Sequence, residues 1–434
     1  MKKYDVIIFG AGIAGLTCAY YLSKKYKVLV LEKSNKSGGV LESISRCNFN
    51  IEVFYHHVFK RDKDFIKLVK DLNLEHKLMW NEAPSAFLYN DNFYELSKPI
   101  DLLWFKPLNF IDKLQLFFLM ARLKLTRDMR RADKYSAREW IIKYGSKEIF
   151  SKFFEPLLYG KYGSNMDSIS AAWFIERINL RSSIGSMGEI LGYVNGGFQN
   201  VINKLEGEIK KNGGKILHNI SPKRIYVKNK YASAVEYDRV KIETKCVVST
   251  IPPKTLSSIA SFPSQYKEKI RNLEYQGSIC VLLALRNPLT RYYWTNIVRK
   301  KKGIFGAIIE HTNYIPKKEY DNKNIVYLGS YPSLKSDLWK LSDKEIFKLY
   351  FSELKQLFPN INKKDVMWMH VAKAKDAGLV YKKGILEQIL PLETPIKNIY
   401  IGGMFNSYPE RGINESIRLG KKIANLVIER HEKN

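Results

Sequence analysis

Cysteine is scarce in this chain of 434 residues, and Cys18, Cys47, Cys246 and Cys280 lie far apart in the sequence. No two of them form a Cys-x-x-Cys pair, so the sequence predicts neither a metal site built on cysteine nor a disulfide framework. Long apolar runs are also missing, because none approaches the ~18 residues of a transmembrane helix. The nearest candidate, 114–121, suits a buried helix or one lying in a membrane interface.

Acidic residues are too few to balance the basic ones. The 43 Asp and Glu against 72 Lys and Arg give a formal net charge of +29. A lysine-rich solvated surface is the simpler explanation. Attraction to an anionic membrane or a phosphorylated substrate is the alternative, favoured by the basic clusters at 127–131 and 299–302. No nucleic-acid-binding module is visible, so no nucleic acid partner is predicted. The scattered cysteines predict a cytoplasmic protein, with the inner face of the membrane as the alternative location.

The most informative motif is Gly10-x-Gly12-x-x-Gly15, which stands between an apolar strand at 5–9 and an amphipathic helix starting at Ile13. Gly10 permits a tight turn, Gly12 lets the backbone approach a pyrophosphate, and Gly15 lets the helix pack on the strand. The start of the helix offers free N–H groups and the positive end of its dipole to the phosphates. The motif therefore predicts a dinucleotide site.

An acidic residue, Glu32, ends the second apolar strand at 28–32. Its carboxylate can accept a hydrogen bond from a ribose hydroxyl and disfavours a 2′-phosphate, so FAD or NAD is preferred to NADP. A second Gly-x-Gly-x-x-Gly motif is missing from the sequence, which argues against a separate nicotinamide site.

Further glycine motifs follow in a fixed order, and the series resembles the flavin amine oxidase superfamily. The stretch from Phe154 to Trp173 is similar to the protoporphyrinogen-oxidase-like branch of that superfamily. The resemblance covers nearly the whole chain, implies FAD as the cofactor, and rests on Gly10 to Gly15, Glu32, Gly38-Gly39, Gly196-Gly197, Val248 to Pro252 and the block from Gly402-Gly403 to Ala424.

The resemblance also implies an α/β fold, in which a doubly wound FAD-binding domain interleaves with an α+β substrate domain carrying a helical cap. We expect the FAD-binding domain at 1–80, 191–270 and 371–434, and the substrate domain at 81–190 and 271–370. Met404 departs from the family pattern, which usually has Asp there. The expected cofactor-binding residues are Gly10, Gly12, Ile13, Ala14, Gly15, Glu32, Lys33, Gly38, Gly39, Gly403, Met404, Gly412, Ile413 and Asn414.

Two adjacent histidines, His56 and His57, follow an expected strand at 49–54 and are the candidate catalytic residues. A histidine titrates near pH 6.5 and can move protons at working pH. If the strand continues, only one of the two faces the flavin; a structural role in a loop is the alternative. The block is similar to a His-containing loop in UDP-galactopyranose mutase. Candidate pocket residues are Tyr292, Tyr293, Trp294, His311, Tyr331, Tyr381 and Tyr408.

Three functional hypotheses follow. The first is an FAD-dependent oxidoreductase that transfers hydride from a small organic substrate to flavin, with the substrate held between the helical cap and the cofactor. The family's amine oxidases often carry a Lys near the flavin on the strand at 278–281, and none occurs here, so oxidation of a C–C, C–O or ring C–N bond is preferred. The second is a flavin-dependent nucleotide-sugar mutase of the UDP-galactopyranose mutase type. The third is a flavoprotein scaffold in peripheral contact with an anionic membrane.

Overall fold

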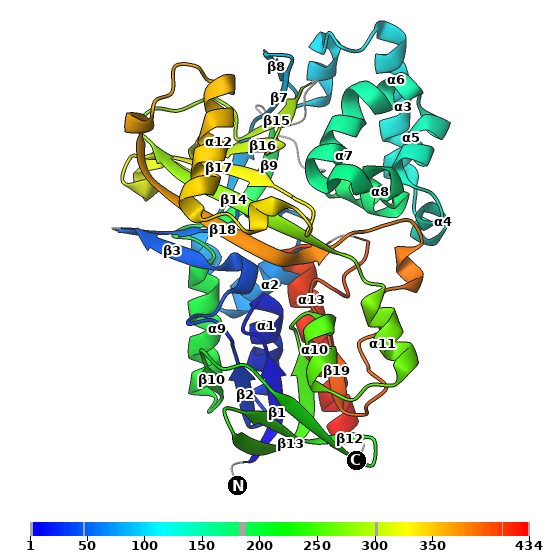
Figure 1. Ribbon diagram of the computed structural model, residues 1–434, viewed down its shortest axis with the longest axis vertical. Helices are drawn as coiled ribbons and strands as arrows, with labels where there is room; N and C mark the ends of the chain where they lie inside the picture. The colour runs from blue at the N-terminus through cyan, green and yellow to red at the C-terminus, as the bar shows by residue number, and fades with distance from the viewer. Residues whose placement is uncertain (1–2, 47, 182–187, 300–302, 410, 433–434) are drawn as a thin grey trace.

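The computed structural model of the protein shows three regions in Figure 1. One region contains a largely parallel sheet and the C-terminal helix, a second contains a long antiparallel sheet with α12 beside it, and the third is a lobe of helices from α3 to α8. Cys47 and the cluster residues Lys300 to Lys302 lie outside the described part of the chain, which comprises residues 3–46, 48–181, 188–299, 303–409 and 411–432.

The largely parallel sheet has the strand order β10-β2-β1-β13-β12-β11, and β19 pairs with the C-terminal half of β13. The strands β10, β2, β1, β13 and β19 are parallel, and β12 and β11 are antiparallel to their neighbours. The strands are β1 Lys3–Phe9, β2 Val28–Leu31, β10 Lys215–Leu217, β11 Arg224–Lys228, β12 Tyr231–Tyr237, β13 Val240–Ser249 and β19 Ile399–Ile401.

Three helices pack beside this sheet, and they come from the start, the middle and the end of the chain: α1 Ile13–Leu22, α9 Gln199–Lys211 and α13 Ile413–Glu432. The contact between α1 and α13 is close because Gly420 lacks a side chain: a Cβ there would lie 2.4 Å from the Ala14 carbonyl oxygen. The C-terminal helix is therefore seated directly on the helix of the N-terminal motif. Two shorter helices, α10 Pro253–Ile259 and α11 Ser264–Arg271, follow β13.

The long antiparallel sheet has the order β18-β14-β17-β16-β15-β7-β8, with β15 and β7 parallel to each other. Every residue of β14 is buried, and α12 (Asp343–Leu357) packs against β14 and β18 through Ile346, Tyr350 and Leu354. The strands are β7 Ser85–Tyr89, β8 Asn92–Glu95, β14 Tyr275–Leu285, β15 Trp294–Val298, β16 Ala307–Glu310, β17 Asn324–Ser330 and β18 Val366–Leu379.

Two small sheets and one helix join these regions. The elements are β3 Ser43–Arg46 paired with β4 Phe49–Glu52, the sheet of β5 Val58–Phe59, β9 Glu189–Val194 and β6 Leu78–Ala83, and the helix α2 Lys63–Asp71. Buried Glu52 at the end of β4 connects this strand to β9 and to the start of α9, because its carboxylate accepts hydrogen bonds of 2.6 Å from the Tyr193 hydroxyl and from the Phe198 N–H.

The helical lobe is built from one continuous stretch of chain around its own aromatic core, in which Phe105, Phe150, Phe154 and Trp173 are buried. The polar ends of its helices are capped locally; Ser136 and Glu139, for example, form a reciprocal capping box. The helices are α3 Phe110–Leu125, α4 Met129–Asp133, α5 Ala137–Tyr144, α6 Lys147–Ile149, α7 Glu155–Tyr162 and α8 Ala171–Leu180. Within the described residues, no helix is both long and apolar enough to cross a membrane.

The α/β fold class is confirmed. The helix expected from Ile13 begins there as α1, and the strands expected at 5–9 and 28–32 are present as β1 and β2. The sequence places a domain boundary at residue 371, which falls inside β18, and that strand pairs with β14 from Tyr275 to Leu285. The strand expected at 49–54 ends at Glu52, so His56 and His57 lie in a loop rather than on opposite faces of a strand.

Candidate functional site

The glycine motif forms a tight turn at the carboxyl end of β1. Gly10 has a φ of +94°, and a Cβ on Gly15 would lie 2.0 Å from the Gly10 carbonyl oxygen, so the helix can approach the turn only without a side chain there. Gly12 is different. It has an ordinary extended conformation, and a Cβ on it would meet no described atom within 4 Å. Its backbone faces open space at the start of α1, and no side chain caps that helix.

The second glycine pair lies directly against the first motif. The Gly38 N–H donates to the Ala11 carbonyl at 2.9 Å, and a Cβ on Gly39 would lie 3.4 Å from the Cα of Gly12. Both glycines have positive φ, +134° and +60°. Two stretches of backbone without side chains therefore line one hollow at the N-terminus of α1, a geometry that suits a pyrophosphate.

The terminal glycine pair also reaches this hollow. The Gly402 N–H donates to the Ser249 carbonyl at 3.0 Å, and Gly403 packs near the Thr250 carbonyl. The Thr250 hydroxyl donates to the Phe9 carbonyl at 2.8 Å. The ends of β1, β13 and β19 therefore meet at one edge of the sheet, where parallel α/β sheets bind ligands.

Buried Glu32 lies beside the same turn. Its carboxylate accepts the Ala11 N–H at 2.7 Å and the Ser34 N–H at 2.8 Å. Each carboxylate oxygen keeps acceptor capacity beyond one bond, so a ribose hydroxyl can be accommodated. The neighbouring Lys33 is exposed.

The N-terminus of α13 begins at a large cavity. Gly412, Ile413 and Asn414 all line this cavity, and a Cβ on Gly412 would meet no described atom within 4 Å. The Asn414 side chain is held in place because its Oδ1 accepts the Phe65 N–H of α2 at 3.0 Å. The free N–H groups at this helix start present a positive dipole end to whatever occupies the cavity.

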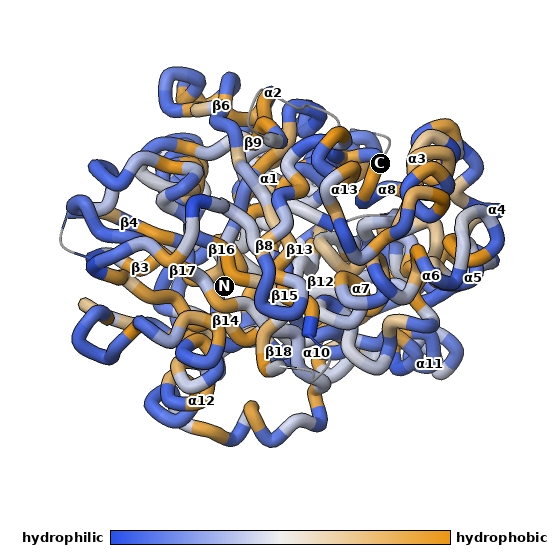
Figure 2. Tube along the Cα trace, turned by 90° about the horizontal axis from the view of Figure 1, so that it is seen from above, coloured by the Kyte–Doolittle hydropathy of each residue, from blue (hydrophilic) through white to orange (hydrophobic). Residues whose placement is uncertain are grey.

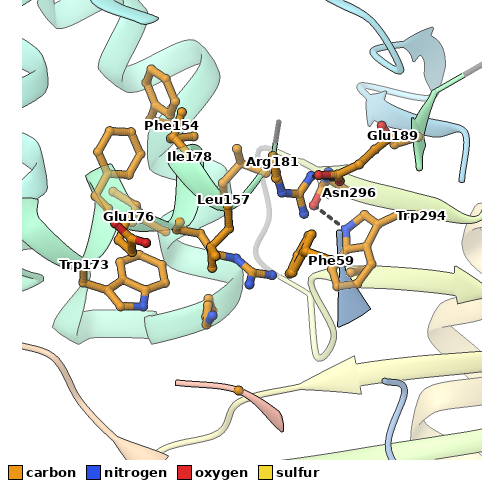
Figure 3. A pocket seen from close by; sticks show the side chains of 18 of the residues that line it. Phe59, Phe154, Leu157, Trp173, Glu176, Ile178, Arg181, Glu189, Trp294 and Asn296 are labelled. Carbon is orange, nitrogen blue, oxygen red and sulfur yellow. Dashed lines mark hydrogen bonds and ion pairs between the residues drawn. The ribbon is translucent and has the colours of Figure 1, made fainter. Parts of the chain in front are cut away.

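The cavity measures about 970 Å³ and lies between the helical lobe and the long sheet. In Figure 3, Phe154, Leu157 and Trp173 enter it from the helices, and Phe59 and Trp294 face them from the other wall. The Trp294 indole N–H donates to Asn296 Oδ1 at 2.9 Å, which fixes the orientation of that ring. Most of the wall is aromatic or aliphatic, which is typical of a pocket for a large organic molecule.

His56 and His57 both line the cavity. Burial lowers the pKa of His56 to about 4. Burial also holds the pKa of His57 well below its ordinary value, with further lowering by the guanidinium groups of Arg177 and Arg181. Both rings are therefore neutral at pH 7. His57 Nδ1 is paired with the Tyr293 hydroxyl at 3.0 Å, and His56 Nδ1 with the Phe54 carbonyl at 2.8 Å.

Charged side chains line the cavity on several elements, and Glu176, Arg177 and Arg181 lie in α8 or directly after it. Arg181 forms an ion pair with Glu189 at 3.6 Å, and the two side chains point toward each other in Figure 3. One oxygen of Glu189 is buried and accepts no hydrogen bond in the described structure. Half-buried Arg177 has no ion pair with any described residue, although it lies close enough to His57 to lower the pKa of that residue.

The structure brings the expected cofactor residues into two places. Gly10 to Gly15, Glu32, Gly38, Gly39 and Gly403 lie at the hollow at β1, whereas Gly412, Ile413, Asn414 and both histidines line the cavity. The Met404 side chain packs against the core beside β1. Of the candidate pocket residues, Trp294, Tyr331 and Tyr408 line the cavity, Tyr293 bonds to His57, and His311 is buried against Tyr320. Among the described residues, no cluster of His, Cys, Asp and Glu is placed to hold a metal.

Sequence reasoning missed Arg177 of α8 and Arg181, which directly follows that helix. One signal was available: Trp173 and Arg177 are four residues apart and share one helix face. That face combines aromatic and basic residues, which is unusual for a buried face. Trp294 of the opposite wall was among the candidate pocket residues, but its position facing α8 was not predicted, because β15 is more than 100 residues away in the sequence.

A family model described as flavin containing amine oxidoreductase matches residues 13–428. Coproporphyrinogen III oxidase of Bacillus subtilis is 28% identical over 182 residues, covering 39% of this chain and 38% of that protein. The match therefore spans well under half the length of that relative. The 15-cis-phytoene desaturase of Synechococcus elongatus is 23% identical over 390 residues, covering 82% of this chain and 80% of that protein.

The fold is shared with solved structures. The crystal structure of reduced UDP-galactopyranose mutase superposes with a TM-score of 0.75 at 14% identity, covering 98% of this chain and 96% of that one. At this identity the likeness shows the fold alone.

Proposed function

The chain belongs to the flavin containing amine oxidoreductase family; from this premise we propose that it is an FAD-dependent oxidoreductase and that it oxidises a large, mostly apolar organic molecule that carries an anionic group. The observation that supports the proposal is the cavity of about 970 Å³, whose wall is largely aromatic and aliphatic but contains Arg177 without an ion-pair partner among the described residues. A substrate with one anionic end and an apolar body matches both features.

The residues present fit FAD. The hollow formed by Gly12, Gly38 and Gly39 is where a Cβ-free backbone would hold the pyrophosphate, and Glu32 would hold the adenosine ribose. The backbone at Gly403 and Met404 and the start of α13 would hold the remainder of the cofactor. When bound, FAD supplies a ring that accepts a hydride equivalent from an adjacent substrate carbon.

The chain's own contribution to the reaction is binding and orientation. Aromatic side chains on both walls exclude water and fix the plane of the substrate, and Arg177 would pair with its anionic group. The backbone N–H groups at Ile413 and Asn414 stabilise negative charge that develops nearby.

His57 is positioned to handle a proton in its neutral form. Its Nδ1 is engaged by Tyr293, which leaves Nε2 as the ring nitrogen that can face substrate. Because the pKa of His57 lies well below its ordinary value, the imidazole accepts a proton only transiently at pH 7. We expect no inflection near pH 6.5 in the activity profile, in contrast to an enzyme whose catalytic histidine titrates there.

The experiment is anaerobic titration of the purified holoprotein, following the visible flavin absorbance. Coproporphyrinogen III, a large ring that carries carboxylates, represents the proposed class, and phytoene dispersed in detergent, a hydrocarbon without an anionic group, is the comparison. The proposal expects coproporphyrinogen III to bleach the flavin and to yield an oxidised product stoichiometrically, and phytoene to bleach it far more slowly. Bleaching by neither compound, or faster bleaching by phytoene, with intact flavin content, would contradict the proposed substrate class.

A second candidate is the nucleotide-sugar mutase, favoured by the basic groups and paired histidines at the cavity. Dithionite-reduced protein is incubated with UDP-galactopyranose without any electron acceptor. Formation of the furanose isomer would replace oxidation with isomerisation as the function. No isomer, together with bleaching by a porphyrinogen or polyene, leaves oxidation as the function.

A further inference from the structure

The helical lobe carries an unusual concentration of exposed apolar side chains. Of the large apolar side chains that are exposed in the described part of the chain, more than half lie between Ile100 and Leu125. The exposed fractions reach 79% at Trp104, 75% at Phe110 and 76% at Leu125. Scattered exposed apolar residues are normal, but a contiguous group of this kind marks an interaction surface.

The group is contiguous because α3 has two apolar faces. Leu116, Leu119 and Leu123 are buried, and α3 contacts α8 and α6. The second face points outward: Ile111, Leu114, Phe118 and Leu125 recur at helical spacing, and all four are exposed. Figure 2 shows α3 at the rim of the molecule, with hydrophobic stretches along it. The preceding segment η3 (Pro99–Trp104) adds Ile100, Leu103 and Trp104 to the same surface.

Exposed basic residues surround this surface. Lys106, Arg122, Lys124, Arg127 and Arg130 are exposed within the same stretch of chain. The nearby acidic groups are fewer: Asp112 is buried, and Asp101 and Asp128 accept hydrogen bonds from the backbone at helix starts. An apolar face bordered by positive charge is complementary to a bilayer with anionic headgroups.

The surface is continuous with the mouth of the cavity. Phe117 is 63% exposed and yet lines the cavity, and Ala121 and Lys124 one and two turns further along α3 do the same. On the η3 side, Lys98, Pro99 and Leu102 also line it. The cavity therefore opens between η3 and α3, at the same place where the apolar side chains are exposed.

We propose that the surface from Pro99 to Leu125 docks the protein on an anionic lipid bilayer, with the side chains of η3 and α3 in the acyl boundary and the cavity mouth facing the membrane. Docking in this way lets a lipid-dissolved substrate move from the bilayer into the cavity without crossing water. The docking step stands on the exposed surface alone, whereas the transfer of substrate rests on the proposed function.

Vesicle co-sedimentation of the FAD-loaded full-length protein tests the docking. Vesicles of phosphatidylglycerol and phosphatidylcholine are compared with phosphatidylcholine alone. The variant W104S/F110S/F118S removes three exposed rings that do not line the cavity, and we expect its partition coefficient to fall roughly 100-fold. The matched control V227S/Y231S/V240S changes three exposed apolar side chains on β11, β12 and β13, and we expect it to bind like the native protein.

Charge and depth are tested separately. The variant K106Q/R127Q/R130Q keeps the apolar face, and we expect it to lose most of the preference for phosphatidylglycerol, as the native protein does in high salt. Brominated lipids should quench Trp104 fluorescence, and W104F should lack the quenched component. Unchanged flavin absorbance and thermal unfolding show that each variant is folded.

Three outcomes would overturn the docking proposal. In the first, the native protein binds neither kind of vesicle. In the second, W104S/F110S/F118S partitions into vesicles to the same extent as its control. In the third, sedimentation velocity shows a native dimer that the triple variant does not form, while the native protein leaves vesicles unbound. Failure of the proposed function looks different. In that case vesicle binding is normal, but coproporphyrinogen III and phytoene fail to bleach the flavin in detergent and in vesicles alike.

Discussion

The hollow at β1 and the cavity beside α8 hold the two ends of one functional site, but they are built by opposite means. In the hollow, glycines bring backbone against backbone, with Gly15 and Gly420 each leaving no room for a side chain. In the cavity, long side chains from α8, β15 and the loop after β4 converge, and charged groups are set among aromatic rings. The first region depends on the absence of side chains at a few positions, and the second depends on side chains that distant parts of the chain bring together. Substitutions should therefore affect them in different ways.

The largest effect is expected for Gly15→Ala. A Cβ there would lie 2.0 Å from the Gly10 carbonyl oxygen, which is backbone and cannot move aside cheaply. We expect the free energy of unfolding to fall by about 3 kcal/mol or more, because overpacking forces the backbone to shift. Thermal unfolding and the ratio of flavin to protein absorbance measure the loss.

The matched control for that substitution is Gly207→Ala in the middle of α9. A Cβ there would meet no described atom within 4 Å. Alanine favours the helix over glycine by about 0.5–1 kcal/mol, so a small gain in stability is expected. Equal behaviour of the two variants would show that the close approach of α1 to the β1 turn is not required.

The cavity side should be the more sensitive region to acid. Burial lowers the pKa of His56 to about 4 and that of His311 to about 3. Below pH 6.5 these histidines therefore bind protons in the unfolded chain but remain neutral in the folded protein. The free energy of unfolding therefore falls as the pH falls from about 6.5 to 4, by about 3 kcal/mol for His56 alone. Urea unfolding at pH 7 and pH 5 measures the difference.

Glu310 changes the free energy of unfolding in the opposite direction over an overlapping range of pH. Burial raises its pKa to about 7, in spite of hydrogen bonds from Leu289 N–H and Thr290 N–H. The folded protein keeps a proton that the unfolded chain loses above pH 4.5, so this group makes the protein less stable as the pH rises toward 7. His56→Gln should flatten the acid loss, and Glu310→Gln should steepen it between pH 4.5 and 7. A Glu310→Gln variant whose stability is constant from pH 7 to 5 would contradict the neutral, buried state of these histidines, because the opposing group is then absent.

The difference between the regions also explains what the sequence could predict. The absence of side chains is a local feature, so Gly10, Gly12 and Gly15, the flanking strand and the helix from Ile13 could be identified from sequence alone. The pairing of β15 with β7, which carries Trp294 to the cavity, joins segments about 200 residues apart, and no pattern within either segment specifies it. The strand expected at 49–54 ends two residues early, at Glu52, whose carboxylate accepts hydrogen bonds from Tyr193 and Phe198. The sequence left the placement of His56 and His57 open between a continued strand and a loop, and the structure has the loop.

An intermediate effect is expected for Arg177→Leu. Its guanidinium has no ion-pair partner among the described residues, so removing it should leave thermal unfolding nearly unchanged. For the compound that bleaches the flavin, we expect KM to rise roughly 30-fold with kcat within about threefold, since one charge-assisted contact is lost. Arg177→Lys should recover part of the loss, because it keeps the charge but not the planar fork. A large fall in thermal stability instead of KM would make Arg177 a structural residue.

The smallest effect on the fold is expected for Gly12→Ala. This substitution separates two roles of glycine: close packing of backbone against backbone, as at Gly15, and approach of the cofactor to the backbone, as at Gly12. Gly12 has φ −72° and ψ 172°, a conformation that alanine adopts without strain, and a Cβ there meets no described atom within 4 Å. The apoprotein should therefore unfold within about 0.5 kcal/mol of the native one. The added methyl group would occupy the hollow beside Gly38 and Gly39, so the Kd for FAD, measured by quenching of flavin fluorescence, should rise roughly tenfold. Native affinity in Gly12→Ala would mean that the cofactor does not approach the backbone at this turn, and the hollow would then lose its assigned role while Gly15 kept its own.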